Sequence, residues 1–135
     1  MKTLIQLFLA IFLLSNSLKP QSDETQKELI VMSFNIRFGG NEPIDDPNHW
    51  LERKYRVFDI IKKNKPDIIG MQEALIGQIN FLDSALNDYY WVGVGRDDGF
   101  NKGEFSPIFY LKERFEIIAK GTFWLSTTPY KPSKG

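Results

Sequence analysis

The sequence predicts an α/β domain, and three features of residues 28–125 favour this class. Short apolar runs alternate with longer segments of helical periodicity, in the order strand, helix, strand, helix, strand. The runs at 28–37 and 66–74 are apolar on both faces, as is typical of parallel strands that are covered on both sides. The segment between them has the length of a crossover helix, so these two strands are expected to be parallel, with a right-handed connection.

Composition limits the chain to one small domain of 135 residues with a balanced charge. Seventeen basic residues offset seventeen acidic ones, so there is no global positive field that would gather nucleic acid or anionic membrane. A local basic groove is compatible with this balance. Because the chain has no cysteine, it forms no disulfide and has no site for a lipid anchor on cysteine.

Residues 1–17 are predicted to be a signal peptide that directs export to the periplasm or the cell exterior. Lys2 provides a positive start, residues 4–14 are almost all apolar, and Ser15, Asn16 and Ser17 suit a signal peptidase. The apolar run is too short for a stable membrane span. A buried N-terminal helix is disfavoured because nearly every side of it would be apolar. The polar stretch 18–27 is interpreted as a linker.

The first helix is expected to start with Asn48 as its N-cap and to run to about Lys63. It follows an acidic loop over residues 38–48. The helical period separates an apolar face from a charged one. The residues expected on the apolar face are Trp50, Val57, Ile60 and Ile61, and those expected to stay mostly in solvent are Glu52, Arg53, Lys54, Lys62 and Lys63.

The rest of the chain is predicted to complete the sheet. A second helix is expected at 75–86, followed by strands at 90–94, 105–110 and 115–125 and a loop at 127–135. A charged, glycine-bearing loop covers 95–103, and the short turn 112–114 predicts an antiparallel pairing of the last two strands. Two helices cover one face of such a sheet and leave the other uncovered, so either a further layer is absent or the chain is a fragment.

Two polar residues mark the ends of the two predicted parallel strands. Asn35 and Glu73 are expected side by side, where an amide and a carboxylate suit a hard divalent cation such as Mg²⁺. Simpler roles remain open: Glu73 could stabilise the N-terminus of the next helix through its charge, and Asn35 could complete a strand-end turn.

Five stretches of the chain resemble the endonuclease/exonuclease/phosphatase family of Mg²⁺-dependent phosphoesterases. They are MSFNIR (32–37), PDIIGMQE (66–73), WVGVGRDDG (91–99), GEFSPIFY (103–110) and TFWLS (122–126). The first two motifs are shared across the family, and the last three resemble a subgroup of exported bacterial hydrolases. Together they cover nearly all of the chain that follows the predicted signal peptide.

The resemblance implies a four-layer α/β sandwich, two sheets face to face with helices outside. It also implies that Glu73 is a catalytic metal ligand for Mg²⁺, with Mn²⁺ as the alternative, and that Asn35 helps to hold metal or phosphate. Residues 28–135 would form the N-terminal portion of the domain. The family's general-base histidine and its aspartate partner belong to a C-terminal half that this sequence lacks, so the chain as given is expected to be truncated and inactive. His49 matches no catalytic motif and is interpreted as a solvated or capping side chain.

The implied activity is attack by water on a phosphate ester, and the protein is expected to be a monomer at full length. Nucleic acid, an inositol phosphate and a phospholipid head group are the candidate substrates. The alternative is a non-catalytic exported binding module, or a truncated gene product, that binds a partner through its open sheet face.

Two arginines are candidate phosphate ligands, each with a plainer alternative. Arg37 could bind phosphate beside Asn35 or pair with the acidic loop that follows it. Arg96 could line a phosphate-recognising rim or belong to a solvated charged loop. The three tryptophans are interpreted as core anchors; they are Trp50, Trp91 and Trp124.

Overall fold

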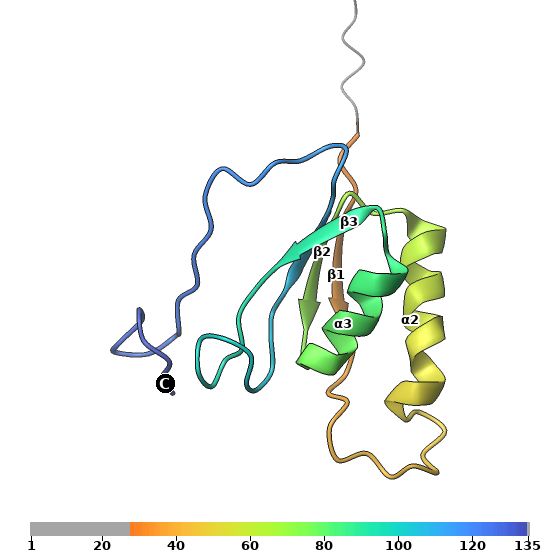
Figure 1. The fold of residues 1–135 in the computed structure, drawn as a ribbon, viewed down its shortest axis with the longest axis horizontal. Helices are drawn as coiled ribbons and strands as arrows, with labels where there is room; N and C mark the ends of the chain where they lie inside the picture. Colours follow the sequence, from red (N-terminus) through yellow and green to blue (C-terminus); the bar gives the residue numbers. More distant parts are fainter. Residues whose placement is uncertain (1–27, 135) are drawn as a thin grey trace, which may run out of the picture.

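A computed structural model describes residues 28–134 (Figure 1). Its elements are β1 (Val31–Asn35), α2 (Trp50–Asn64), β2 (Ile68–Gln72), α3 (Ile76–Ala85), β3 (Tyr89–Val92) and β4 (Ile108–Leu111). The predicted α/β class is confirmed. The predicted signal peptide and linker lie outside the described residues. Across residues 28–134, no helix is both long enough and apolar enough to cross a membrane.

The four strands form one sheet in the order β1-β2-β4-β3. β1 and β2 are parallel, as predicted, and their register places Asn35 opposite Gln72. β4 runs antiparallel to β2 on one side and to β3 on the other. Because β1 and β2 end level with each other, the residues that follow them leave the sheet at the same edge.

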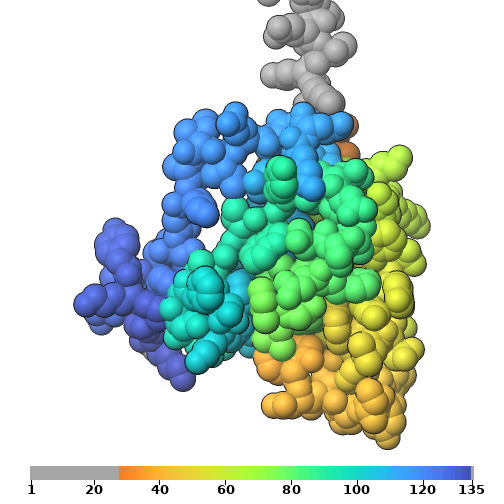
Figure 2. Space-filling view, in the orientation of Figure 1, coloured from red at the N-terminus to blue at the C-terminus, as the bar shows by residue number. Residues whose placement is uncertain are grey.

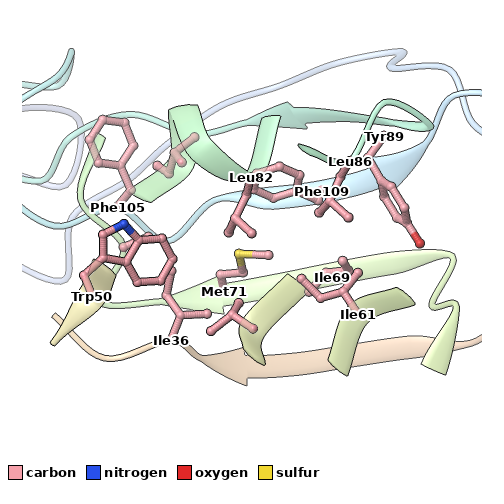
Figure 3. Close-up of a cluster of buried hydrophobic side chains, with 13 residues drawn as sticks. Ile36, Trp50, Ile61, Ile69, Met71, Leu82, Leu86, Tyr89, Phe105 and Phe109 are labelled. Carbon is pink, nitrogen blue, oxygen red and sulfur yellow. The ribbon is translucent and has the colours of Figure 1, made fainter. Parts of the chain in front are cut away.

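α2 and α3 lie on the same side of the sheet and cover one of its faces (Figure 1). Figure 3 shows the core between them, in which Ile69, Met71 and Phe109 from the sheet are at most 1% exposed. Ile61 from α2 and Leu82 from α3 are fully buried against the same cluster. Removing such side chains from water stabilises the fold by about 1.5–3 kcal/mol each.

Within residues 28–134, no helix or strand covers the opposite face of the sheet. Val31, Tyr90 and Ile108 point to this face, since they alternate with the core residues of their strands, and their exposed fractions are 63%, 55% and 46%. This open face agrees with the expectation that two helices would cover one side only.

α2 differs from its prediction in two ways. Its N-cap is His49, not Asn48, and the His49 Nδ1 accepts a hydrogen bond from the Leu51 N–H at 3.2 Å. Arg53 is buried at 7% exposure, whereas Ile60 is 42% exposed. The cause is helical geometry: Trp50, Arg53 and Ile61 share the stripe that faces the sheet, and Ile60 lies one residue, or about 100°, away from it.

The predicted strand over 115–125 is wrong, as is its antiparallel hairpin with the preceding strand. β4 already pairs with β2 on one edge and with β3 on the other, so it has no free edge to offer a further strand. The 112–114 segment instead turns back to the sheet, where Arg114 forms an ion pair with Asp67. Figure 2 shows the last part of the chain, in dark blue, standing out from the body of the molecule.

Candidate active site

Asn35 and Glu73 meet at the edge of the sheet where β1 and β2 end. The Asn35 Nδ2 donates a hydrogen bond to the Glu73 Oε1 at 2.7 Å, as expected for the ends of two parallel neighbours. The backbone N–H of Phe38 donates to the other carboxylate oxygen, Oε2, at 3.0 Å. The Asn35 Oδ1 accepts from the Arg37 N–H at 2.8 Å, which fixes the orientation of the amide.

These two hydrogen bonds favour the ionised form of Glu73. The Asn35 amide, and then the Phe38 N–H, lower the pKa of the Glu73 carboxyl below its ordinary value, and they outweigh the opposing effect of partial burial. Each carboxylate oxygen has one lone pair engaged by these donors and another left for a ligand. Glu73 therefore presents a fixed negative charge, on a left-handed backbone turn with φ of 60°.

Arg37 points to the acidic loop instead of joining Asn35 and Glu73. Its guanidinium pairs with Glu42 at 3.4 Å and with Asp46 at 3.2 Å, while its side chain stays 50% exposed. Of the two alternatives for Arg37, the structure shows the pairing with the acidic loop.

Arg96 shares a cleft with Glu73. The cleft has a volume of about 1070 Å³, and its walls include Glu73, Arg96, Glu104, Ser106 and Trp124. It lies between the ends of the sheet and the C-terminal segment. A carboxylate that can bind a cation and a guanidinium that can bind an anion thus face the same solvent-filled space.

Arg96 has polar partners on two sides, and its side chain is 59% exposed. Its guanidinium lies 3.2 Å from the Glu104 carboxylate and 3.6 Å from that of Asp97. The Trp124 indole N–H donates to the backbone carbonyl of Arg96 at 2.7 Å. Gly103 has φ of 78°, which a side chain would strain, and a Cβ there would also displace the Asp97 carboxylate, whose Cγ would lie 2.5 Å away.

Two features of the site were missed by the sequence analysis. The Phe38 N–H is a backbone donor, so no side-chain type could have revealed it. Trp124, interpreted as a core anchor, is half-buried in the cleft wall against Gly99. The residues on either side of Trp124, Phe123 and Leu125, are apolar, so the local sequence gave no signal against a core position.

The donor set around Glu73 is sparse. Among residues 28–134 there is no group of three or more His, Cys, Asp or Glu side chains that could hold a metal ion. Glu73 supplies carboxylate oxygens, whereas Asn35 presents its Nδ2 to that carboxylate and its Oδ1 to the Arg37 N–H. A single carboxylate fits Mg²⁺, which is often held by one or two carboxylates and completes its shell with water and substrate phosphate. The proposed roles of Asn35, Glu73, Arg37 and Arg96 stay predictions.

Comparison with known proteins identifies the family. Residues 32–133 match the model of the endonuclease/exonuclease/phosphatase family, and the chain belongs to that family. This is the family that the five motifs of the sequence resemble.

Solved structures from two Bacteroides species are similar to this chain. The mannosyl-6-phosphatase of Bacteroides thetaiotaomicron is 41% identical with a TM-score of 0.75, and the match covers 80% of this chain and 40% of that one. A family member from Bacteroides vulgatus is 43% identical with a TM-score of 0.71, covering 76% of this chain and 39% of that one. An uncharacterised protein of Acanthamoeba polyphaga mimivirus is 28% identical over 132 residues, which are 87% of this chain and 19% of that protein. The chain thus spans well under half the length of these proteins.

Proposed function

We propose that the protein is an exported, divalent-metal-dependent hydrolase of phosphate esters, in which Glu73 holds Mg²⁺ or Mn²⁺. The observation that carries this proposal is the Asn35–Glu73–Phe38 arrangement, an ionised carboxylate fixed by two donors. It opens into the same cleft as Arg96. When bound there, a divalent cation would neutralise negative charge on the phosphoryl oxygens and the leaving group.

The chain's own residues have distinct parts in this proposal. Glu73 anchors the cation, and Asn35 orients the carboxylate through its amide N–H. Arg96 lies where a phosphoryl oxygen could reach its guanidinium. The general base that the family resemblance implies is not among residues 28–134, where His49 is engaged as the N-cap of α2. Turnover is therefore expected of a protein that also carries the C-terminal half, together with a second sheet that covers the open face.

Two observations favour a small sugar or polyol phosphate as the substrate over nucleic acid. A similar protein is a mannosyl-6-phosphatase. In addition, the Arg96 charge is offset by Glu104 and Asp97, so this wall of the cleft has no cationic excess with which to bind a polyanion. Inositol phosphate, also a polyol phosphate, fits this class.

A calorimetric titration with Mg²⁺, and with Mn²⁺, tests the proposed metal site. Glu73→Gln keeps the size of the side chain and removes its charge, so it is expected to weaken metal binding at least tenfold. The matched control is Glu104→Gln, which removes one charge from the same cleft and leaves Glu73 in place. Equal metal affinity in the wild type and in Glu73→Gln would refute Glu73 as the ligand.

A second candidate function rests on the open sheet face. With Val31, Tyr90 and Ile108 exposed, the chain could act as a binding module that uses this face. A monomer that melts cooperatively and does not bind a hydrophobic dye would argue against it. Metal binding that depends on Glu73 favours the hydrolase instead.

A further inference from the structure

One backbone carbonyl next to the site is held by buried side chains from two different helices. The Arg53 Nη2, from α2, donates to the carbonyl oxygen of Arg37 at 2.8 Å. The Gln78 Nε2, from α3, donates to the same oxygen at 3.1 Å. Arg53 is 7% exposed and Gln78 is 2% exposed. Since a carbonyl oxygen has two lone pairs, the two donors saturate it.

The positive charge of Arg53 is paired with the Glu42 carboxylate, and this ion pair holds the side chain in place. Its Nη1 donates to both carboxylate oxygens of Glu42, at 2.7 and 2.8 Å, and the Glu42 side chain is 5% exposed. Its Nε donates to the carbonyl of Ile36 at 3.3 Å. A buried guanidinium with all of these partners has little freedom to move, because releasing any of them would leave a buried charge or donor unsatisfied.

Gln78 is held in the same way from α3. Its Oε1 accepts from the Leu75 N–H at 3.0 Å, at the start of the helix, which leaves the Nε2 aimed at Arg37. Gly39 lies directly over this amide, and a Cβ at Gly39 would be 2.8 Å from the Gln78 Cδ. The loop after β1 is thus packed closely onto the Gln78 side chain.

The geometry of the peptide bond links this carbonyl to Glu73. The Arg37 C=O and the Phe38 N–H belong to one planar trans peptide, so they point in opposite directions. Whatever fixes the carbonyl therefore also aims the N–H, and the Phe38 N–H donates to the Glu73 Oε2 at 3.0 Å. Arg37 has φ of 63°, a left-handed conformation that a residue other than glycine keeps only when its surroundings hold it.

We propose that Arg53 and Gln78 are positioning residues that clamp the Arg37–Phe38 peptide and so keep its N–H on the Glu73 carboxylate. Neither side chain forms a hydrogen bond or an ion pair with Glu73, whose partners are Asn35 and the Phe38 N–H. The importance of this clamp for catalysis rests on the proposed function, in which Glu73 is the metal ligand. The clamp itself is a property of the folded chain and can be tested without metal.

Gln78→Glu removes the hydrogen bond to the Arg37 carbonyl but keeps the one from the Leu75 N–H at the start of α3. The new carboxylate can still accept from the Leu75 N–H, but it cannot donate to the Arg37 carbonyl. Arg53→Lys keeps the charge that faces Glu42 and removes the planar set of donors. Asn80→Asp adds the same charge to an exposed position of α3, and Arg56→Lys makes the same exchange at an exposed position of α2. These two variants are the matched controls.

The measurement is amide hydrogen exchange by NMR, with Phe38 as the reporter and Met71 as the internal reference. Met71 donates to the Pro107 carbonyl inside the sheet, so its exchange reports on the fold as a whole. Gln78→Glu and Arg53→Lys are expected to speed exchange at Phe38 at least tenfold relative to Met71. The two controls are expected to leave that ratio within twofold of the wild type.

Two results would overturn the proposal. One is an unchanged Phe38-to-Met71 ratio in folded Gln78→Glu. The other, which needs no variant, is a wild-type Phe38 amide that exchanges as fast as an unprotected one. Metal titration separates the two hypotheses: a protected Phe38 in a chain that binds no Mg²⁺ refutes the proposed function and leaves the clamp intact. Weaker Mg²⁺ binding in Gln78→Glu, with Asn80→Asp unaffected, would show that the clamp acts on the metal site.

Discussion

The two walls of the cleft are built differently. The wall that carries Glu73 consists of strand ends and a loop that buried side chains hold from behind, and Arg53 there is 7% exposed. The opposite wall carries Arg96, whose side chain is 59% exposed, and it is joined to the C-terminal segment through Trp124. One wall is held from behind by buried side chains, whereas the other consists of the exposed β3–β4 loop, closed by backbone hydrogen bonds such as that from the Arg96 N–H to the Glu104 carbonyl, and of the C-terminal segment. The wall that carries Glu73 is therefore expected to be the more rigid of the two.

The largest expected effect is a difference in stability loss between a substitution in the core behind the wall with Glu73 and one in the C-terminal segment. Phe109→Ala removes a fully buried ring from the centre of the sheet and should lower the free energy of unfolding by about 3–5 kcal/mol. Phe123→Ala truncates a ring that is 67% exposed and should change it by no more than about 0.5 kcal/mol. Urea unfolding of residues 28–135, followed by circular dichroism, measures both. Similar losses in the two variants would mean that the C-terminal segment is part of the core.

The second effect concerns the ion pair that supports the clamp. Glu42→Ala leaves the Arg53 charge buried without its partner and should cost about 3 kcal/mol of stability. Asp45→Ala, in the same loop, is the control, and is expected to cost about 0.5 kcal/mol or less because Asp45 is exposed. Equal urea midpoints for Glu42→Ala and the wild type would show that the pair contributes nothing.

The same pair predicts a dependence of stability on pH. Burial alone would raise the pKa of Glu42, but the Arg53 hydrogen bond, the Trp50 N–H and the nearby positive charges together lower it. Because the folded pKa is below the unfolded one, this stabilisation is full above the ordinary value of about 4.3 and is lost as the pH falls below it. Urea midpoints between pH 7 and pH 3 should therefore fall more steeply for the wild type than for Glu42→Gln. Parallel curves would contradict the shift.

The sequence predicted the first wall better than the second, for a physical reason. The β1–α2–β2 unit depends on local apolar periods and on the handedness of the crossover, and both are readable in one chain. The strand expected at 115–125 has an adequate apolar pattern, but forming it requires a free sheet edge, which is a non-local condition. Arg53 was misplaced because a charged side chain marks the solvent face unless a buried partner such as Glu42 is known. The left-handed turns at Arg37 and Glu73 have no residue-type signal either, since neither residue is glycine.

The smallest expected effect tests how the second wall is attached. Trp124→Phe keeps an aromatic ring against Gly99 and removes the N–H that donates to the Arg96 carbonyl. Loss of one solvent-accessible hydrogen bond should cost about 0.5–1 kcal/mol, and only locally, because the core does not depend on this contact. The urea midpoint is therefore expected to stay that of the wild type, while exchange of the Gly99 amide, which donates to the Gly95 carbonyl, becomes faster. Trp124→Leu, which also removes the aromatic ring, should speed that exchange further. A drop in global stability in Trp124→Phe would mean that the wall carrying Arg96 is as integral to the fold as the wall carrying Glu73.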